Sequence, residues 1–194
     1  MQFIPPDYFR KLEKAEIFPQ QPRQLEIDLG CGDGSFLAAL AGHYPERDFL
    51  GIERLLGRAR KASRKAYQVD LENLKVLRLE ISYALLWLLP DQCASRIHLL
   101  FPDPWPKKKH HKRRLVSIEF CAALTRVLEP GGEFLLKTDD EEYFEESMDV
   151  LADAPGLKEA PWEDVTGFYP QTDFERRWLG QGKTIQSARF KVSD

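Results

Sequence analysis

Several features that would place a protein in a membrane, outside the cell or around a metal ion are missing from this sequence. No apolar run in its 194 residues approaches the roughly 20 residues of a membrane-spanning helix. The first residues lack the basic and long apolar segments of a signal peptide. Cys31, Cys93 and Cys121 are too far apart for a Cys-x-x-Cys metal pair, and their odd number argues against a disulfide framework. These absences predict a cytoplasmic protein in a reducing setting, with no bound metal and no membrane contact.

The overall charge is small, and its sign is unusual for a protein that binds nucleic acid. The net charge is −3. The charges are spread unevenly, however, because bases gather in residues 54–65 and 107–114 while acids gather in residues 139–146. Binding of a polyanion depends more on the distribution of charge than on its sum, so a local basic surface is compatible with an acidic protein.

Internal repeats and low-complexity tracts are absent, and apolar strand-like runs alternate with helix-like stretches. Strands are predicted at residues 25–29, 49–52, 74–79, 97–101, 133–137 and 185–192. Helices are predicted at residues 35–42, 55–67, 83–89, 115–128 and 140–151. This alternation predicts an α/β fold with a parallel sheet and right-handed crossovers. We divide the chain into an N-terminal segment at residues 1–23, which is an arm or a loosely attached helix, and one domain at residues 24–194. Residues 161–183 lack clear periodicity, which is typical of a functional or a disordered loop.

A glycine-rich segment, Asp28-Leu29-Gly30-Cys31-Gly32-Asp33-Gly34, follows the first predicted strand and precedes the first predicted helix. Glycines at such a place permit a positive φ and let a cofactor approach the backbone. The next strand ends in Glu53, whose carboxylate could bind both hydroxyls of a ribose. Taken alone, the loop is weak evidence, because a tight strand–helix turn with no ligand has the same composition.

Two classes of cofactor compete for this loop. A dinucleotide enzyme would place the third glycine one position later, where this chain has Ser35. Asp28 would repel a pyrophosphate but suits a cation, and S-adenosylmethionine carries a sulfonium and an α-amino group without phosphate. The loop therefore favours S-adenosylmethionine over NAD, and the chain here resembles the class I, Rossmann-like methyltransferases. That resemblance implies a mostly parallel seven-stranded sheet with an antiparallel C-terminal strand and helices on both faces. Glu80 ends the third strand, where it either meets the adenine amino group or is solvated.

The segment Phe101-Pro102-Asp103-Pro104-Trp105-Pro106 is followed at once by the basic residues 107–114. Its three prolines fix φ and remove backbone donors, so the segment is neither a helix interior nor a central strand. It follows a short apolar run that reads as a buried strand, and open α/β sheets bind ligands at the carboxyl ends of their strands. The sequence therefore predicts a carboxylate and a flat ring in a binding cleft, beside a surface suited to polyanions.

The resemblance to a family becomes specific at this segment. Phe-Pro-Asp-Pro-Trp with the downstream His-x-Lys-Arg-Arg resembles the signature of bacterial tRNA (guanine-N7)-methyltransferases of the TrmB type. Further segments match: residues 49–53 resemble the family's second strand, residues 137–139 the end of its fifth strand, and residues 172–175 its C-terminal Thr-x-Phe-Glu motif. The likeness runs from about residue 25 to the C-terminus. It implies transfer of a methyl group from S-adenosylmethionine to N7 of the variable-loop guanine in tRNA.

The same resemblance implies roles for individual residues. The cofactor would contact the loop glycines and four acids: Asp28, Gly30, Gly32, Gly34, Glu53, Glu80 and Asp103. The guanosine region of the substrate would contact Lys107, Asp139, Thr172, Asp173, Phe174 and Glu175. The basic run would lie against RNA through Lys108, Lys109, His110, His111, Lys112, Arg113 and Arg114. The family usually has Glu at the position of Asp28 and Asp at that of Glu80, so both swaps keep the charge and move it by one methylene.

Guanine N7 has an in-plane lone pair and no proton, so its methylation requires no general base. Catalysis should rest on holding sulfur, methyl and N7 in line, with Asp103 as the residue expected to do so. Two rival functions remain open: a methyltransferase for an exocyclic amine or a small molecule, and a non-catalytic RNA-binding protein with this fold. The basic face of residues 54–65 either extends the RNA surface or is merely solvated. The oligomeric state, monomer or homodimer, also stays open.

Overall fold

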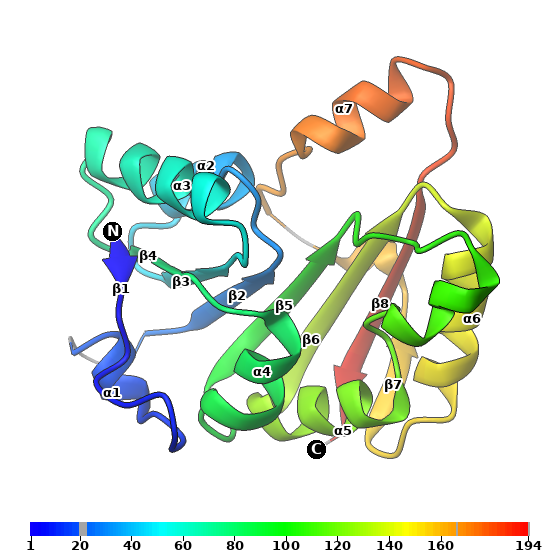
Figure 1. Ribbon diagram of the computed structural model, residues 1–194, viewed down its shortest axis with the longest axis horizontal. Coiled ribbons are helices and arrows are strands. Elements are labelled where there is room, and N and C mark those ends of the chain that lie inside the picture. Colours follow the sequence, from blue (N-terminus) through cyan, green and yellow to red (C-terminus); the bar gives the residue numbers. More distant parts are fainter. Residues whose placement is uncertain (20–22, 166, 194) are drawn as a thin grey trace.

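A computed structural model describes residues 1–19, 23–165 and 167–193 of the chain. Its strands are β1 (Gln2–Phe3), β2 (Leu25–Leu29), β3 (Asp48–Ile52), β4 (Leu74–Leu77), β5 (Ala94–Leu100), β6 (Leu128–Thr138), β7 (Leu157–Ala160) and β8 (Gln186–Val192). Its α-helices are α1 (Lys14–Ile17), α2 (Ser35–His43), α3 (Leu56–Gln68), α4 (Ile81–Tyr83), α5 (Ile118–Val127), α6 (Glu141–Ala152) and α7 (Asp173–Leu179). Figure 1 shows how they surround one sheet.

In the described chain, eight strands form one sheet in the order β1-β4-β3-β2-β5-β6-β8-β7. The pairs from β1 to β6 are parallel, whereas β8 runs antiparallel to both β6 and β7. Every residue of β2 and β3 is buried, as expected for central parallel strands covered on both faces. The predicted α/β fold, with a mostly parallel sheet and an antiparallel C-terminal strand, is confirmed. The expected strand number of seven is wrong, because β1 adds an edge strand beside β4 in the described chain.

Two hydrophobic clusters cover the two faces of the sheet. One joins Phe49 of β3 to apolar side chains of α2 and α3. The other joins Leu50 of the same strand to α1, α5, α6 and the π-helical turn Ala84–Leu88 that follows α4. Because successive side chains of a strand point to opposite faces, these neighbours place the clusters on opposite sides. Helix α7 belongs to neither layer and lies beyond the carboxyl ends of β5 and β6 (Figure 1).

The N-terminal residues are more firmly attached than the sequence suggested. Strand β1 pairs in parallel with β4 at the edge of the sheet, and the ammonium group of Met1 donates to the carbonyl of Leu74 at 2.5 Å. Phe3, Leu12 and Ile17 are buried in the larger cluster. The prediction of a loosely attached arm is therefore wrong for residues 1–19, and residues 20–22 of that arm lie outside the described residues.

The helices and the cysteines bear on the predictions about membranes and disulfides. In the described part of the chain, no helix combines the length and the apolarity needed to cross a membrane. Cys31, Cys93 and Cys121 are free and buried. Burial raises the pKa of the Cys93 thiol to about 12 and that of Cys121 to about 11, so both behave as small apolar side chains.

Candidate cofactor and RNA site

A cleft of about 630 Å³ opens at the carboxyl ends of the central strands, where the strand order reverses at β2. Open α/β sheets bind ligands at such a switch point. A second hollow of about 220 Å³ adjoins it, and the two share Gly30, Arg58, Leu100 and Phe101 in their walls. Glu53, Glu80 and Asp103 line the larger cleft, and Asp28 and Gly32 line the smaller hollow. The structure thus brings the four predicted cofactor acids together.

The glycine loop between β2 and α2 is shaped by its own backbone and by Glu53. Gly30, Gly32 and Gly34 have φ values of +90°, +57° and +77°, a region that L side chains rarely adopt. The Glu53 carboxylate accepts hydrogen bonds from the amides of Gly32 at 3.2 Å and Leu55 at 2.7 Å. Glu53 therefore holds the loop and the start of α3 in addition to facing the cleft.

Gly34 has a packing role and lines neither hollow. A Cβ at this position would lie 2.7 Å from Cβ of Ala62, so the glycine allows α3 to approach the loop closely. A Cβ at Gly32 would meet no atom within 4 Å, because that position faces open space. Of the predicted cofactor glycines, Gly30 and Gly32 face the site, whereas Gly34 supports it from behind.

Asp28 is a buried acid with an unusual proton affinity. Its side chain is 3% exposed, and no hydrogen bond reaches its carboxylate from the residues that the structure describes. Burial, with the nearby Glu53 carboxylate as a second cause, raises the pKa of Asp28 to about 7. A buried carboxylate with no polar partner that borders a hollow is suited to a cationic group. The site therefore fits the ammonium and sulfonium of S-adenosylmethionine better than a pyrophosphate.

Glu80 caps the first turn of α4 by accepting a hydrogen bond from the amide of Tyr83 at 2.9 Å. It also lines the larger cleft, beside Ile81. The cap explains how its backbone is held, and the other carboxylate oxygen is left for a ligand in the cleft.

The proline-rich turn after β5 is held between two strained aromatic residues. Phe101 and Trp105 have φ values of +53° and +45°, which are uncommon for bulky side chains. Backbone strain of this kind costs about 1–3 kcal/mol for each residue and is concentrated at functional sites. Between them, Asp103 is exposed, lines the larger cleft and accepts a hydrogen bond from the Trp105 amide at 3.0 Å. The turn thus presents Asp103 and Trp105 to the cleft, as predicted.

Part of the aperiodic segment 161–183 folds into helix α7, which the sequence reading missed. The hydroxyl of Thr172 caps this helix by accepting a hydrogen bond from the amide of Glu175 at 3.0 Å. Phe174 stacks on Phe101, with ring centroids 6.4 Å apart and planes at 23°. Thr172, Asp173 and Phe174 line the smaller hollow, so three of the predicted substrate residues reach the site.

The other predicted substrate residues lie differently. Glu175 is buried and pairs with Nζ of Lys137 at 2.5 Å, and it lines neither hollow. Asp139 pairs with Nζ of Lys183 at 2.5 Å. Lys107 is exposed before the basic turn and also lies outside the two linings. The two acids are therefore paired with lysines, and each ion pair uses one carboxylate oxygen.

The basic run forms a 3-10 turn, Lys108–Arg113, whose members differ in their surroundings. Lys108, Lys109 and Lys112 are exposed. Arg113 lies over the Trp105 ring at 4.8 Å and lines the larger cleft, and His110 meets the same ring edge-on at 5.7 Å. These residues form a basic rim on the turn side of the cleft.

Two residues of the basic run face inward. The side chain of Arg114 is 5% exposed, donates to the carbonyl of Pro104 at 2.9 Å and forms an ion pair with Glu146 of α6. His111 lies within 3.6 Å of Glu142 and Glu146 on the same helix. Arg114 therefore attaches the turn to α6, and His111 is largely occupied in the same way. Contact of either residue with RNA stays a prediction.

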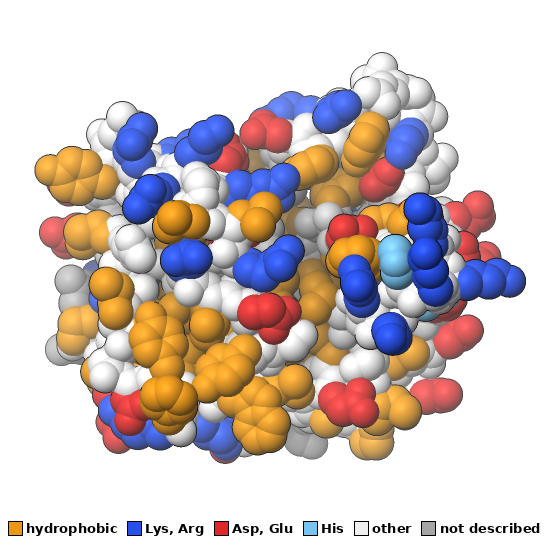
Figure 2. All heavy atoms as spheres, viewed as in Figure 1, with side chains coloured by type: hydrophobic (Ala, Val, Ile, Leu, Met, Phe, Trp, Pro, Cys, Tyr) orange, Lys and Arg blue, Asp and Glu red, His pale blue; other side chains and the backbone are white. Residues whose placement is uncertain are grey.

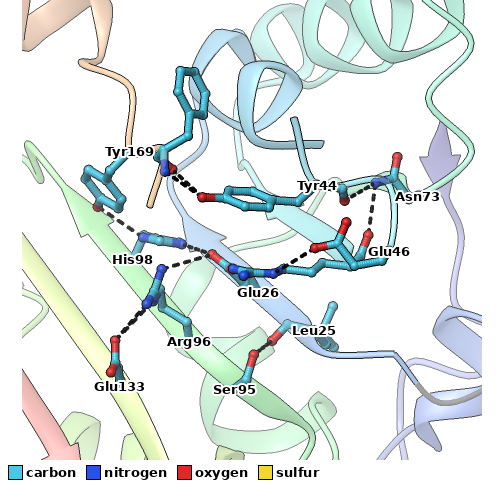
Figure 3. A network of polar contacts seen from close by, with 12 residues as sticks. Leu25, Glu26, Tyr44, Glu46, Asn73, Ser95, Arg96, His98, Glu133 and Tyr169 are labelled. Carbon is cyan, nitrogen blue, oxygen red and sulfur yellow. Dashed lines mark hydrogen bonds and ion pairs between the residues drawn. The ribbon is translucent and has the colours of Figure 1, made fainter. Parts of the chain in front are cut away.

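A buried polar network beside the site was not predicted (Figure 3). Nε2 of His98 on β5 lies 3.0 Å from Glu26 on β2, and its Nδ1 lies 3.1 Å from the hydroxyl of Tyr169. Arg47 donates to Glu26 at 2.9 Å, and Arg96 donates to Glu133 at 2.9 Å. In the sequence, the histidine within the apolar run of residues 97–100 could have indicated this network.

Comparison with named proteins of similar sequence identifies the family of this chain. The sequence matches the family described as "Putative methyltransferase" over residues 22–188. It is 37% identical to the tRNA (guanine-N(7)-)-methyltransferase of Nitrosococcus oceani over 94% of this chain and 77% of that protein. The corresponding protein of Alkalilimnicola ehrlichii is 40% identical over 84% of this chain and 70% of its own length. The chain belongs to the tRNA (guanine-N(7)-)-methyltransferase family.

Another relative has the same name but is much longer than this chain. The chain is 34% identical to the tRNA (guanine-N(7)-)-methyltransferase of Thermotoga maritima and spans 55% of that protein. Among solved structures, it resembles the 16S rRNA methyltransferase KamB with a TM-score of 0.64 and 19% identity, over 95% of this chain and 96% of that one. That likeness shows the fold alone. Membership of the methyltransferase family confirms the predicted methyl donor, S-adenosylmethionine.

Proposed function

We propose that this chain transfers the methyl group of S-adenosylmethionine to N7 of guanine 46 in the variable loop of tRNA. The observation that carries the proposal is the meeting of Glu53, Glu80 and Asp103 in the larger cleft with Asp28 in the adjoining hollow, below a basic rim. Acids inside a cleft suit a cationic cofactor, and cations at its rim suit a polyanionic substrate. The names of the family relatives supply the tRNA and the N7 atom.

Each acid has a separate task in this proposal. The buried Asp28 would hold the ammonium of the cofactor in its ionised form, and Glu53 would bind ribose hydroxyls while keeping the glycine loop in place. Glu80 would accept from the adenine amino group through the oxygen that does not cap α4. Bound S-adenosylmethionine supplies a methyl group on a positively charged sulfur.

The protein's contribution to the reaction would be positioning and exclusion of water. Guanine N7 carries a lone pair and loses no proton, so no residue has to act as a general base. Asp103 is fixed by the Trp105 amide on a strained turn, and its free carboxylate oxygen could accept from the N1–H and N2–H edge of the guanine. Trp105 and the stacked pair of Phe101 and Phe174 offer flat apolar surfaces for a base that has left its stack.

The proposal is tested by incubating unmodified tRNA transcripts with labelled S-adenosylmethionine and cleaving the product with borohydride and aniline at 7-methylguanosine. We expect a single cut in the variable loop. Asp103→Ala should lower kcat/KM on the order of a hundredfold, because the reacting atoms lose their alignment. Glu72→Ala, which changes an exposed acid far along the chain from the turn, is the matched control and should keep wild-type activity.

Other outcomes would change the assignment in defined ways. Methyl incorporation without a cut would keep a methyltransferase and exclude N7 as the acceptor. A cut outside the variable loop would keep N7 and exclude guanine 46. Tight binding of S-adenosylmethionine with no incorporation into any tRNA would favour the non-catalytic RNA-binding alternative.

A further inference from the structure

Helix α3 carries a group of cations that the site described above does not use. Arg58, Arg60, Lys61 and Arg64 lie on the helix, and Arg54 lies just before it. All five are exposed, and none of their side chains has a hydrogen bond, an ion pair or a ring contact with any residue in the described ranges. We name these five residues the α3 basic face. Lys65, by contrast, is neutralised by Asp33 at 2.9 Å.

The charges of this helix are unfavourable for the helix itself. Its first turn contains no acid, and Leu55 at the N-cap provides no side-chain hydrogen bond. Positive charge near a helix N-terminus opposes the helix dipole, and like charges three or four residues apart repel one another. Arg58 and Lys61 are such a pair, as are Arg60 and Arg64. The folded protein thus contains an uncompensated basic face that costs stability, which is expected where an anionic partner supplies the missing charge.

The opposite side of α3 explains why this face is fixed at the site. Ala59, Ala62 and Ala66 are buried against the sheet, and Ala62 lies against the glycine loop at Gly34. These small side chains let the helix approach the loop closely. The basic face is therefore held rigidly beside the cofactor cleft.

The α3 basic face and the basic turn border the same cleft from opposite sides. Arg54 and Arg58 line the larger cleft from the α3 side, and Arg113 lines it from the side of the turn. Figure 2 shows Lys and Arg side chains on both sides of the hollowed middle of the molecule, with acidic side chains between them. The acids of the cleft repel phosphate, so a nucleic acid that inserts a base there has to rest its backbone on the two rims.

We propose that the α3 basic face binds the phosphate backbone of tRNA, as a second wall opposite the basic turn of residues 108–113. This inference rests on the proposed function, because it takes tRNA as the substrate of the cleft. Contacts to phosphate carry no base sequence information, and they fix the register of the substrate on the enzyme. The α3 basic face would then orient the tRNA, while the cleft receives the guanine.

The test uses the full chain with Lys61→Gln and Arg64→Gln together, two exposed residues that line neither hollow. The control pair, Lys14→Gln with Lys158→Gln, removes the same charge from α1 and β7, where neither lysine side chain forms a hydrogen bond or an ion pair with a described residue. tRNA affinity is measured by filter binding between about 50 and 200 mM salt, the range over which phosphate contacts lose most of their strength. Cofactor affinity and Tm are measured alongside.

We expect the α3 pair to bind tRNA about tenfold more weakly than the control pair. The slope of log K against log salt should fall by about 0.7–0.9 for each lost phosphate contact. Cofactor affinity should stay at the wild-type value, and Tm should be unchanged or higher because like charges are removed. A structural role for these residues would lower Tm instead.

Two results would overturn the inference and are distinguishable. If wild-type protein methylates tRNA and the α3 pair has the affinity and salt slope of the control pair, the α3 basic face is merely solvated and the proposed function stands. If wild-type protein neither binds nor methylates tRNA, the proposed function fails and the inference fails with it. Loss of cofactor affinity in the α3 pair would also overturn it, since the effect would then arise inside the cleft.

Discussion

Nδ1 of His98, in the centre of the sheet, lies 3.1 Å from the hydroxyl of Tyr169, in the segment that leads to α7. This contact joins a buried strand to the residues that border the smaller hollow. Burial lowers the pKa of His98 below 6.5, although its hydrogen bond to Glu26 opposes the shift. Burial opposes ionisation of Glu26, but its contacts with His98, Arg96 and Arg47 outweigh that and lower its pKa to about 2.

These directions fix the protonation of the network. A neutral His98 donates from Nε2 to the Glu26 carboxylate and accepts at Nδ1 from the Tyr169 hydroxyl. Tyr44 holds the neighbouring residue, because its hydroxyl accepts from the Phe168 amide at 2.6 Å (Figure 3). The start of the segment that carries Thr172 and Phe174 is thus attached to the domain by two tyrosines.

Tyr169→Phe should therefore weaken both stability and substrate use. The change leaves Nδ1 of His98 buried without a donor, which costs about 1–3 kcal/mol. We expect urea unfolding to show that loss and methylation kinetics to show a higher KM for tRNA, since α7 is held less firmly. Tyr67→Phe, at a tyrosine that is 75% exposed, is the control and should change neither. Unchanged KM in Tyr169→Phe would show that the position of α7 does not depend on this contact.

Asp28 should link cofactor binding to pH. Burial raises its pKa from the usual 3.8 to about 7, so the free protein keeps this acid largely protonated below neutral pH. A cationic ligand favours the ionised form, and calorimetry should show affinity for S-adenosylmethionine rising as pH increases through about 7. Asp28→Asn should bind at least about tenfold more weakly, a loss of about 1.4 kcal/mol, with a flatter pH profile.

The same substitution should raise the stability of the free protein at alkaline pH. The folded-state pKa is above the unfolded one, so the protonated acid's contribution is lost as pH rises from about 4 to about 7. Asp28→Asn cannot ionise and should have a higher Tm than wild type at pH 8. A lower Tm for the variant at that pH would contradict the conclusion that ionised Asp28 destabilises the folded protein.

Glu175 and Asp139 both resemble substrate-binding acids, but their ion pairs differ in burial. Glu175→Gln removes the counter-charge of the buried Lys137 and should cost about 3–5 kcal/mol of unfolding free energy. Asp139→Asn breaks a more exposed pair with Lys183 and should cost less than about 1 kcal/mol. Denaturation with parallel kinetics separates the two. If Asp139→Asn lowers kcat/KM without loss of stability, Asp139 contacts the substrate.

Local chemistry explains which parts of the site the sequence could predict. The glycine loop, Glu53 and the turn around Asp103 are each set by residues adjacent in the chain, so their place at strand ends followed from the pattern. Arg114 and Glu175 lie inward because of Glu146 and Lys137, which are distant in sequence. Charge alone does not distinguish a side chain that faces RNA from one that forms a buried ion pair.

The elements that were missed are short or lack a pattern. Strands β1 and β7 have two and four residues, too few for an alternation to be recognised. Helix α7 has seven residues, but Thr172 with Glu175 three residues later is the spacing of a helix N-terminus and would have indicated its start. His98 interrupts an apolar run, and its partner Tyr169 lies too far along the chain to be inferred from spacing.

Alanine substitutions at two glycines of the glycine loop should have opposite effects on stability and on cofactor affinity. Gly34→Ala would place Cβ 2.7 Å from Ala62 Cβ and 2.9 Å from its Cα, in addition to the strain of a φ of +77°. Gly32→Ala meets no atom within 4 Å and carries only the strain of its φ, about 1–2 kcal/mol. Gly34→Ala should therefore destabilise the protein considerably more, as measured by thermal unfolding.

The two variants should lose affinity for the cofactor in the reverse order. The methyl group of Gly32→Ala projects into the space beside the smaller hollow, so this variant should lose affinity for S-adenosylmethionine while remaining folded. Gly34→Ala lines neither hollow and should bind the cofactor once it is folded at low temperature. Adding Ala62→Gly to Gly34→Ala removes the contacting Cβ and should recover part of the lost Tm. If the added change recovers none, the close approach of α3 to the loop is not what requires glycine at position 34.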